Sequence, residues 1–278
     1  MPLRSILTAT LMLGAAVSAV PAAADPPDAS APTVSTVESS YPTTHGPQAM
    51  TVYYPGDPAA VHDAPAVVMV HGGAWVVGSR SLLDAVARQT AAAGFVVVNI
   101  EYDMSATPRY PREIADVQAA IDYVHADAPH LGVDPDRIGG LGTSAGANLI
   151  MLAATTRPDS LRAVVGWSGP YDLTTDAPGN SGVLPAVLYP SCAPGTAPCT
   201  AMAADASPIT HVAAGDPPAL LFNSDHELVA LSQLTRFADR LRAAGDQVQT
   251  QILPGTRHAS QYAADATEPS IAFLRSQL

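Results

Sequence analysis

Three side chains that are far apart in the sequence have the types needed for nucleophilic acyl transfer. Ser144 lies in Gly142-Thr143-Ser144-Ala145-Gly146, with an apolar run before it and a small-residue helical run after it. This is the nucleophile-elbow pattern, in which a strand turns sharply into a helix and exposes a serine. Glycine two residues to either side lets the strand and the helix pass closely. Ser144 is therefore the candidate nucleophile, and an ordinary tight turn is the alternative for the pattern taken alone.

A serine hydroxyl is a weak nucleophile, so it needs a general base that a carboxylate orients. His258 directly follows the last expected strand, and we expect it to be the base. The acid should follow the preceding strand, where Asp225 and Glu227 flank His226. We favour Glu227 because its longer side chain can reach across, and Asp225 is the second candidate.

Backbone N–H groups must also stabilise the oxyanion that forms on the acyl carbon. A short apolar strand early in the chain leads into His71-Gly72-Gly73-Ala74-Trp75. We expect the N–H groups of Gly73, Ala74 and Ala145 to form the oxyanion hole. We expect His71 to make structural hydrogen bonds in this loop. Trp75 is a candidate for the substrate pocket, with plain packing as the alternative.

Short apolar runs that alternate with helical patterns are expected to position these side chains. The pattern is typical of an α/β fold with a mostly parallel central sheet and helices on both faces. The carboxyl ends of parallel strands meet at one edge, so this topology brings the serine, histidine and acid loops together. The expected strands are 50–54, 66–70, 95–100, 137–141, 163–167, 219–222 and 248–253, and the expected helices are 82–93, 111–127, 145–156, 231–244 and 269–278.

The amino-terminal segment has the pattern of a secretory signal peptide. Arg4 precedes an apolar run from Ile6 to Val20, and Ala22-Ala23-Ala24 ends in an A-x-A cleavage pattern. We therefore expect residues 1–24 to be a signal peptide, cut after about Ala24, and the protein to be secreted. The apolar run is too short for a stable membrane anchor. An uncleaved anchor is the alternative.

The rest of the chain divides into a tail, one domain and an insertion. Residues 25–45 are expected to be a mobile tail, and residues 46–278 a single α/β domain. The regular alternation breaks over 171–214, which is rich in Pro, Gly and Ala, so this stretch is expected to be a lid-like insertion.

Charge and cysteine content narrow the possible partners. The formal net charge of −12 argues against nucleic acid and anionic membrane surfaces as partners. Cys192 and Cys199 lie seven residues apart in the insertion, without a nearby His/Cys pair. They are poor zinc ligands, and in an oxidising compartment we expect a disulfide bond between them; two free thiols are the alternative. We expect no metal and no organic cofactor.

Together these motifs resemble the α/β-hydrolase fold, and specifically the esterase/lipase branch with hormone-sensitive-lipase-like and feruloyl-esterase-like carboxylesterases. The chain departs from the usual pattern at three places. Ala74 stands where relatives usually carry a third glycine, His226 falls on the usual aspartate position, and Glu101-Tyr102-Asp103 replaces a common Asp-Tyr-Arg segment. The resemblance rests on 71–75, 101–102, 110–111 with Asp116, 142–148, 207–209 and 254–255 with His258.

The resemblance implies a serine carboxylester hydrolase that acts through an acyl-enzyme on small or polymer-borne esters, and the signal-peptide pattern adds that it is secreted. We expect short- to medium-chain acyl groups, because 171–214 is mixed in polarity and Pro-rich rather than strongly apolar. One alternative is a serine peptidase of the prolyl-oligopeptidase type. The other is a non-catalytic binding protein on the same fold, and the irregular acid loop is its only support.

Overall fold

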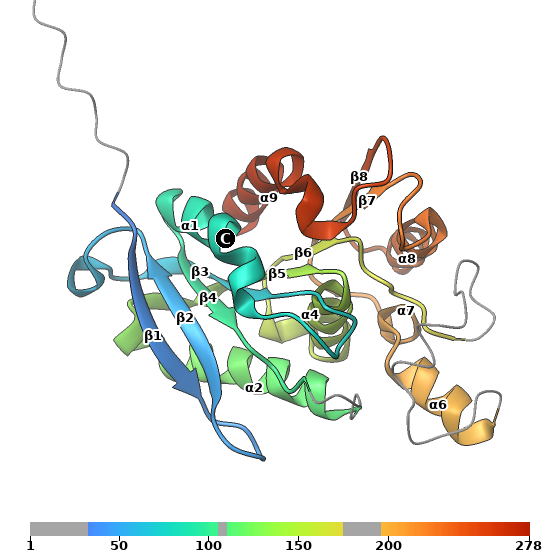
Figure 1. Ribbon diagram of the computed structural model, residues 1–278, viewed down its shortest axis with the longest axis horizontal. Helices are drawn as coiled ribbons and strands as arrows, with labels where there is room; N and C mark the ends of the chain where they lie inside the picture. The colour runs from blue at the N-terminus through green and yellow to red at the C-terminus, as the bar shows by residue number, and fades with distance from the viewer. Residues whose placement is uncertain (1–32, 105–109, 175–195) are drawn as a thin grey trace, which may run out of the picture. The chain divides into compact units, whose positions relative to one another are not determined.

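The computed structural model describes residues 33–104, 110–174 and 196–278, within the compact unit Pro32–Leu278 (Figure 1). The predicted signal peptide over 1–24 lies outside the described residues. The same holds for residues 175–195 of the predicted lid-like insertion, which include Cys192.

One mostly parallel sheet forms the centre of the described chain. Its strand order is β1-β2-β4-β3-β5-β6-β7-β8. β1 pairs with β2, and β2 with β4, in antiparallel ladders, whereas the pairs from β4 through β3 to β8 are parallel. The strands are β1 (Ser35–Tyr41), β2 (Gln48–Tyr54), β3 (Ala64–Val70), β4 (Val96–Ile100), β5 (Val133–Thr143), β6 (Val164–Trp167), β7 (Ala219–Ser224) and β8 (Val248–Leu253).

Helices cover both faces of this sheet, as the alternating pattern predicts. α1 and α9 lie on one face, and α2, α4 and α8 lie on the other (Figure 1). The helices are α1 (Asp84–Ala92), α2 (Arg112–Ala126), α3 (Ala128–Leu131), α4 (Ala145–Thr156), α6 (Ala197–Asp205), α7 (Pro208–His211), α8 (Leu231–Ala244) and α9 (Ala263–Gln277). Short 3-10 turns are η1 (Pro58–Ala60), η2 (Arg80–Leu83), η3 (Pro158–Ser160) and η4 (Ala259–Tyr262).

The central strands are apolar on both faces because each face packs on helices. In β3, Val68 and Val70 belong to the core shared with α2 and α4, whereas Val67 and Met69 belong to the core shared with α1 and α9. A strand buried on both faces has a continuous apolar sequence instead of an alternating one. The short apolar runs in the sequence therefore predicted these strands correctly, and the α/β fold is confirmed.

The predicted mobile tail over 25–45 is wrong where the structure describes it. Residues Ser35–Tyr41 form β1, which pairs with β2 along its whole length. Its sequence, STVESSY, is mostly polar and its side chains are mostly exposed, so it gives no apolar signal. Backbone hydrogen bonds to β2 hold this edge strand in place.

The carboxyl-terminal helix is also longer than predicted. Proline is typical of the first turn of a helix, so Pro269 predicts a helix that starts at that residue. In the structure α9 begins at Ala263 and Pro269 lies inside it. The helix therefore starts shortly after the loop that carries His258.

The described part of the insertion packs against the helix that follows Ser144. α7 contacts both α4 and α8. The Asn148 side chain in α4 donates hydrogen bonds to the carbonyl oxygens of Pro170 and Ala206, each at 3.0 Å. Cys199 in α6 is buried, and its predicted disulfide with Cys192 remains a prediction. Within the described ranges, no helix combines the length and apolarity of a membrane span.

Two neighbouring carboxylates lie beside the start of β7. Asp216 is 6% exposed, and its Oδ2 accepts a hydrogen bond from the Ala213 N–H at 3.1 Å. Asp216 Oδ1 and Asp246 Oδ2 are both buried without a hydrogen-bond partner among the described residues. Burial and the nearby charge of Asp246 raise the pKa of Asp216 to about 6, against the lowering effect of the Ala213 hydrogen bond.

The raised pKa of Asp216 predicts a pH-dependent gain in stability for Asp216→Asn. A carboxyl that binds its proton more tightly when folded makes the free energy of unfolding fall as pH rises from about 4 to about 6. The variant lacks this loss, so we expect it to be more stable than the original protein by about 1 kcal/mol or more at pH 7. Urea unfolding of the variant and of the original protein, at pH 7 and at pH 4.5, measures this difference in the free energy of unfolding. A difference that stays constant between the two pH values contradicts the prediction.

Candidate active site

Ser144 lies at the sharp turn between β5 and α4. Its backbone has a φ of 52° and a ψ of −119°, an unfavourable conformation for a residue with a side chain. The Ser144 N–H donates to the Trp167 carbonyl oxygen at 2.7 Å, which ties the turn to the neighbouring strand β6. The turn therefore holds the serine hydroxyl beyond the carboxyl end of the sheet.

The two glycines of the elbow allow this turn because backbone atoms occupy the space of their absent side chains. A Cβ atom on Gly142 would lie 2.3 Å from the Gly146 carbonyl oxygen. A Cβ atom on Gly146 would lie 2.1 Å from the carbonyl oxygen of Val70, at the end of β3. Any other residue at either position forces the strand and the helix apart.

His258 lies within hydrogen-bonding distance of Ser144. Its Nε2 is 2.9 Å from the Ser144 Oγ. The His258 N–H donates to the Gln261 Oε1 at 2.8 Å, which fixes the loop between β8 and η4. The imidazole is 21% exposed, so one edge faces the solvent. This geometry allows Nε2 to take the serine proton.

Glu227, and not Asp225, contacts the other nitrogen of this imidazole. The Glu227 Oε2 pairs with the His258 Nδ1, and the Glu227 side chain is fully buried. Its Oε1 accepts hydrogen bonds from the Ser224 N–H and the Ser168 hydroxyl, both at 2.8 Å. The extra methylene of glutamate lets the side chain fold back under the loop.

Asp225 has different partners. Its Oδ1 accepts hydrogen bonds from the Gly255 N–H at 2.8 Å and from the His226 Nδ1 at 2.7 Å. The hydrogen bond from His226, followed by the one from Gly255, holds the pKa of Asp225 below its usual value. Asp225 therefore joins two surface loops and does not orient His258.

Ser168 is a site residue that the sequence analysis missed. It follows β6 directly, with a φ of 55°, and its hydroxyl donates to the Glu227 carboxylate. The same Oγ accepts from the Ala259 N–H at 2.8 Å and lies 2.7 Å from the Tyr262 hydroxyl. Burial raises the pKa of Tyr262, so its hydroxyl remains a donor to Ser168. Ser168 thereby links the carboxylate to the loop that follows His258.

The only sequence signal for Ser168 was its place after a strand of the parallel sheet. The carboxyl ends of such strands carry site residues in open α/β sheets. A single serine after Trp167 belongs to no motif, and its position after a strand is too weak a signal to identify it as a site residue.

The three predicted oxyanion donors lie on the elbow (Ala145) and on the loop beside it (Gly73 and Ala74). Among the described residues, the N–H groups of Gly73, Ala74 and Ala145 have no hydrogen-bond partner. A Cβ atom on Gly72 would lie 2.9 Å from the Ser144 Cβ, so the loop backbone passes directly beside the serine. Free N–H groups next to a nucleophile can bind developing negative charge.

The loop that carries Gly73 and Ala74 is held in an unusual conformation. Gly73, Ala74 and Trp75 have φ values of 133°, 50° and 62°. A Cβ atom on Gly73 would lie 1.6 Å from the Val77 carbonyl oxygen, so this position requires glycine. Ala74 takes up the left-handed conformation with a side chain present, which is unfavourable for alanine.

A pocket of about 340 Å³ opens over Ser144 and His258. Its rim includes three strongly exposed apolar side chains, Val77 at 63%, Leu82 at 52% and Leu228 at 80%. Trp75 is 1% exposed, packs in the core and is not among the lining residues, so its predicted pocket role lacks support here. The lining is Gly72, Gly73, Ala74, Val77, Leu82, Thr143, Ser144, Leu228, His258, Ala259, Ser260 and Gln261.

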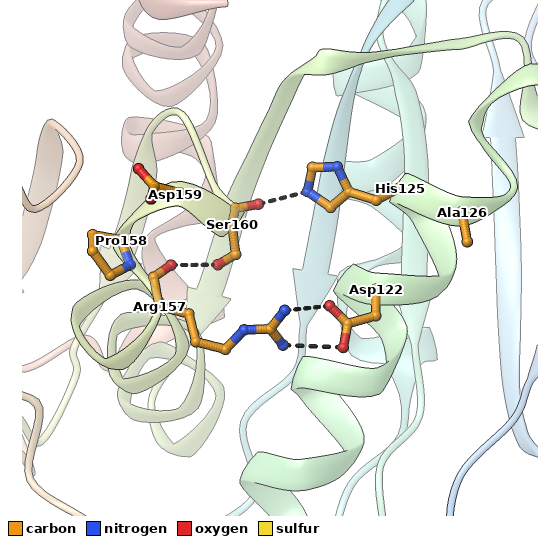
Figure 2. A pocket seen from close by; sticks show the side chains of 7 residues that line it. All are labelled: Asp122, His125, Ala126, Arg157, Pro158, Asp159 and Ser160. Carbon is orange, nitrogen blue, oxygen red and sulfur yellow. Dashed lines mark hydrogen bonds and ion pairs between the residues drawn. The ribbon is translucent and has the colours of Figure 1, made fainter.

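A larger hollow of about 630 Å³ lies at the other end of α4 (Figure 2). Arg157 and Asp122 form an ion pair there, and the His125 Nε2 is 2.9 Å from the Ser160 carbonyl oxygen. It contains no nucleophile paired with a base. Across the described ranges, no group of three or more His, Cys, Asp or Glu side chains is arranged to hold a metal ion.

Comparison with known proteins finds a matching family model and relatives that are named as esterases. Residues 50–241 match the model of the BD-FAE family. Esterase LipC of Mycobacterium tuberculosis is 33% identical over 235 residues, which is 74% of this chain and 58% of LipC. The probable carboxylic ester hydrolase LipM of the same organism is 32% identical over 220 residues, 70% of this chain and 49% of LipM. The chain thus spans about half to three-fifths of the length of these relatives.

The structure is similar to that of a solved carboxylesterase. EstE1, a thermophilic carboxylesterase cloned from a metagenomic library, superposes with a TM-score of 0.74 at 26% sequence identity. The match covers 88% of this chain and 89% of EstE1. The chain therefore belongs to the BD-FAE family and has the α/β-hydrolase fold of the esterase and lipase branch.

Proposed function

We propose that this protein is a serine carboxylester hydrolase. The observation that carries the proposal is the hydrogen-bonded series Ser144–His258–Glu227, which lies beside three backbone N–H groups that have no acceptor among the described residues. A relative named as an esterase at 33% identity supports the same activity.

In the proposed mechanism Ser144 attacks the ester carbonyl carbon while the His258 Nε2 takes its proton. Glu227 holds the imidazole in the correct orientation and stabilises the imidazolium that forms. The oxyanion of the tetrahedral intermediate accepts hydrogen bonds from the N–H groups of Gly73, Ala74 and Ala145. Each such donor is worth on the order of 3 kcal/mol of transition-state stabilisation.

The rest of the reaction proceeds in two stages, collapse of this intermediate and hydrolysis of the acyl-enzyme. His258 gives its proton to the alkoxide, the C–O bond of the ester breaks, and the alcohol leaves. Ser144 remains as an acyl ester. A water molecule, deprotonated by His258, attacks that ester through a second tetrahedral intermediate, which releases the acid and restores the Ser144 hydroxyl. No redox step and no external group is required.

We propose short- to medium-chain acyl esters as the substrates. The support is the pocket of about 340 Å³ and its rim of Val77, Leu82 and Leu228. Burying a methylene group stabilises binding by about 0.8 kcal/mol, so each added carbon that contacts this rim can raise kcat/KM by about fourfold. The increase in kcat/KM with acyl-chain length should stop once the chain covers the rim.

We also propose that the protein is exported. The support is the signal-peptide pattern over 1–24 and the pair Cys192 and Cys199, whose disulfide would persist in an oxidising compartment.

Ser144→Ala should abolish ester hydrolysis, with kcat/KM falling by a factor on the order of 10⁴ or more, because the nucleophile is lost. The measurement is a panel of p-nitrophenyl esters from acetate to dodecanoate, with a prolyl amide included. We expect activity on the shorter esters and none on the amide. Undiminished hydrolysis in the variant rules out the mechanism, and activity on the amide alone favours a peptidase.

Glu227→Gln should lower kcat by a factor on the order of 10² to 10⁴, because an amide cannot orient and stabilise the His258 imidazolium. The matched control is Asp225→Asn two residues away, which we expect to stay within about twofold of the original kcat. Steady-state kinetics on p-nitrophenyl butyrate compare the two. If Asp225→Asn causes the larger loss, the assignment of the acid is wrong.

Ser168→Ala should lower kcat by about 10- to 100-fold with little change in KM. It removes one hydrogen bond to a buried carboxylate, and a hydrogen bond to a charged group is worth about 1.5–3 kcal/mol. Ser39→Ala, on the exposed edge strand β1, is the matched control and should have no effect. A normal kcat for Ser168→Ala would show that Glu227 is held well enough by the Ser224 N–H alone.

A further inference from the structure

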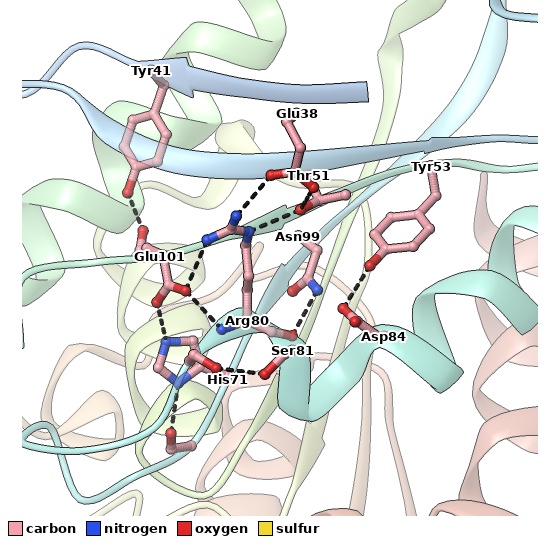
Figure 3. Close-up of polar contacts among 12 residues, drawn as sticks. Glu38, Tyr41, Thr51, Tyr53, His71, Arg80, Ser81, Asp84, Asn99 and Glu101 are labelled. Atoms are coloured by element: carbon pink, nitrogen blue, oxygen red, sulfur yellow. Dashed lines mark hydrogen bonds and ion pairs between the residues drawn. The ribbon is translucent and has the colours of Figure 1, made fainter. Parts of the chain in front are cut away.

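The loop that carries the Gly73 and Ala74 N–H groups is tied at both ends to one carboxylate, that of Glu101 (Figure 3). Glu101 directly follows β4 and does not line the pocket. We propose that Glu101 is a positioning residue for the oxyanion hole, and that it acts through His71 and Arg80. The proposal rests on the function proposed above.

The first end of the loop is His71, which is completely buried. Its Nε2 lies 3.1 Å from the Glu101 Oε2, and its Nδ1 lies 2.6 Å from the Gly72 carbonyl oxygen. The two ring nitrogens therefore bridge the Glu101 carboxylate and the Gly72 carbonyl oxygen. The Tyr102 ring stacks on the His71 ring at 4.7 Å. Glu101 thus fixes the ring that holds the carbonyl of Gly72, the residue whose Cα lies next to Ser144.

The second end of the loop is Arg80, at the start of η2. Its N–H donates to the Glu101 Oε1 at 3.1 Å, and its Nη1 donates to the same oxygen at 3.0 Å. The guanidinium also reaches the hairpin of β1 and β2, with contacts to Thr51 Oγ1 at 2.8 Å and Glu38 Oε2 at 2.7 Å. The Asn99 side chain donates to the Arg80 carbonyl oxygen at 2.8 Å. The loop is therefore closed onto the sheet by Glu101.

The contacts at both ends of the loop favour the ionised form of this carboxylate. Burial favours the neutral acid, but the hydrogen bonds from His71 and Arg80 outweigh it and hold the pKa of Glu101 below its usual value. The side chain is 17% exposed, so solvent screens these charges only partly. Glu101 therefore joins the buried His71 ring and the Arg80 guanidinium through one carboxylate.

The loop needs external support because its own conformation is unfavourable. Three consecutive residues from Gly73 have positive φ, and the loop's internal backbone hydrogen bonds are those from the Val76 and Val77 N–H groups to the Gly73 carbonyl oxygen. Such backbone conformations persist only where the surroundings fix them. A misplacement of about 1 Å at a reacting group can cost about 100-fold in rate. Loosening the ends of the loop should therefore act on kcat.

The test combines kinetics with amide hydrogen exchange of the 71–80 segment in Glu101→Gln. We expect kcat to fall about 10- to 100-fold, KM to stay within about threefold, and the 72–79 amides to exchange at least about tenfold faster. Asp122→Asn is the matched control, because it removes a carboxylate from an arginine pair at the other end of α4 (Figure 2). It should leave both measurements within about twofold.

Two results overturn the proposal. Unchanged exchange in Glu101→Gln shows that the carboxylate does not hold the loop. Faster exchange with unchanged kcat shows that the loop does not need holding for catalysis. If the original protein hydrolyses no ester while Glu101→Gln still loosens the loop, the proposed function fails and the contact role of Glu101 stands.

Glu101→Asp keeps the test decisive if Glu101→Gln does not fold. It retains the negative charge, but its shorter side chain cannot bond His71 and Arg80 together. We expect a kcat loss of about fivefold with faster loop exchange. Kinetics and exchange equal to those of the original protein would refute the two-ended role of Glu101.

Discussion

The candidate site depends on a backbone contact that only glycine permits, between the end of β5 and the start of α4. Because Gly142 and Gly146 have no side chains, the helix begins close to the carboxyl ends of β3 and β5. This brings the Ala145 N–H, the loop after β3 and the hydroxyl of Ser144 to one point. The close-packed hydrophobic cores on both faces of the sheet hold β5 and α4 rigidly. The turn between them therefore fixes the position of the Ser144 hydroxyl oxygen.

Around that point, the polar groups fall into two separate sets. Glu227 belongs to the set that handles the proton, through Ser168, Ser224 and His258. Glu101 belongs to the set that handles the oxyanion, through the loop after β3. Both carboxylates accept several hydrogen bonds and neither faces the pocket, so each acts by holding another group. The two sets share no side chain among these contacts, so substitutions in one set should leave the contacts of the other unchanged.

Much of this arrangement could be predicted from the sequence, because apolar runs and glycine spacing are local signals. The elbow, the loop with Gly73 and the parallel strands were found in this way, and the choice of Glu227 over Asp225 agrees with the contacts of His258. β1 escaped prediction because its pairing is a backbone property of a polar edge strand. Ser168 and Glu101 escaped because their roles depend on partners 59 and 30 residues away, which no local pattern encodes.

β8 lies at the edge of the sheet, so the part of the active site that follows it can open locally while the rest of the fold stays intact. β8 pairs only with β7 in this sheet, and none of its side chains is fully buried. Regions with few buried apolar contacts open locally at a lower free-energy cost than the core of a domain. His258 follows β8 directly, so such an opening withdraws the base while the elbow stays formed. Such a local opening would remove catalytic activity reversibly, without unfolding of the domain.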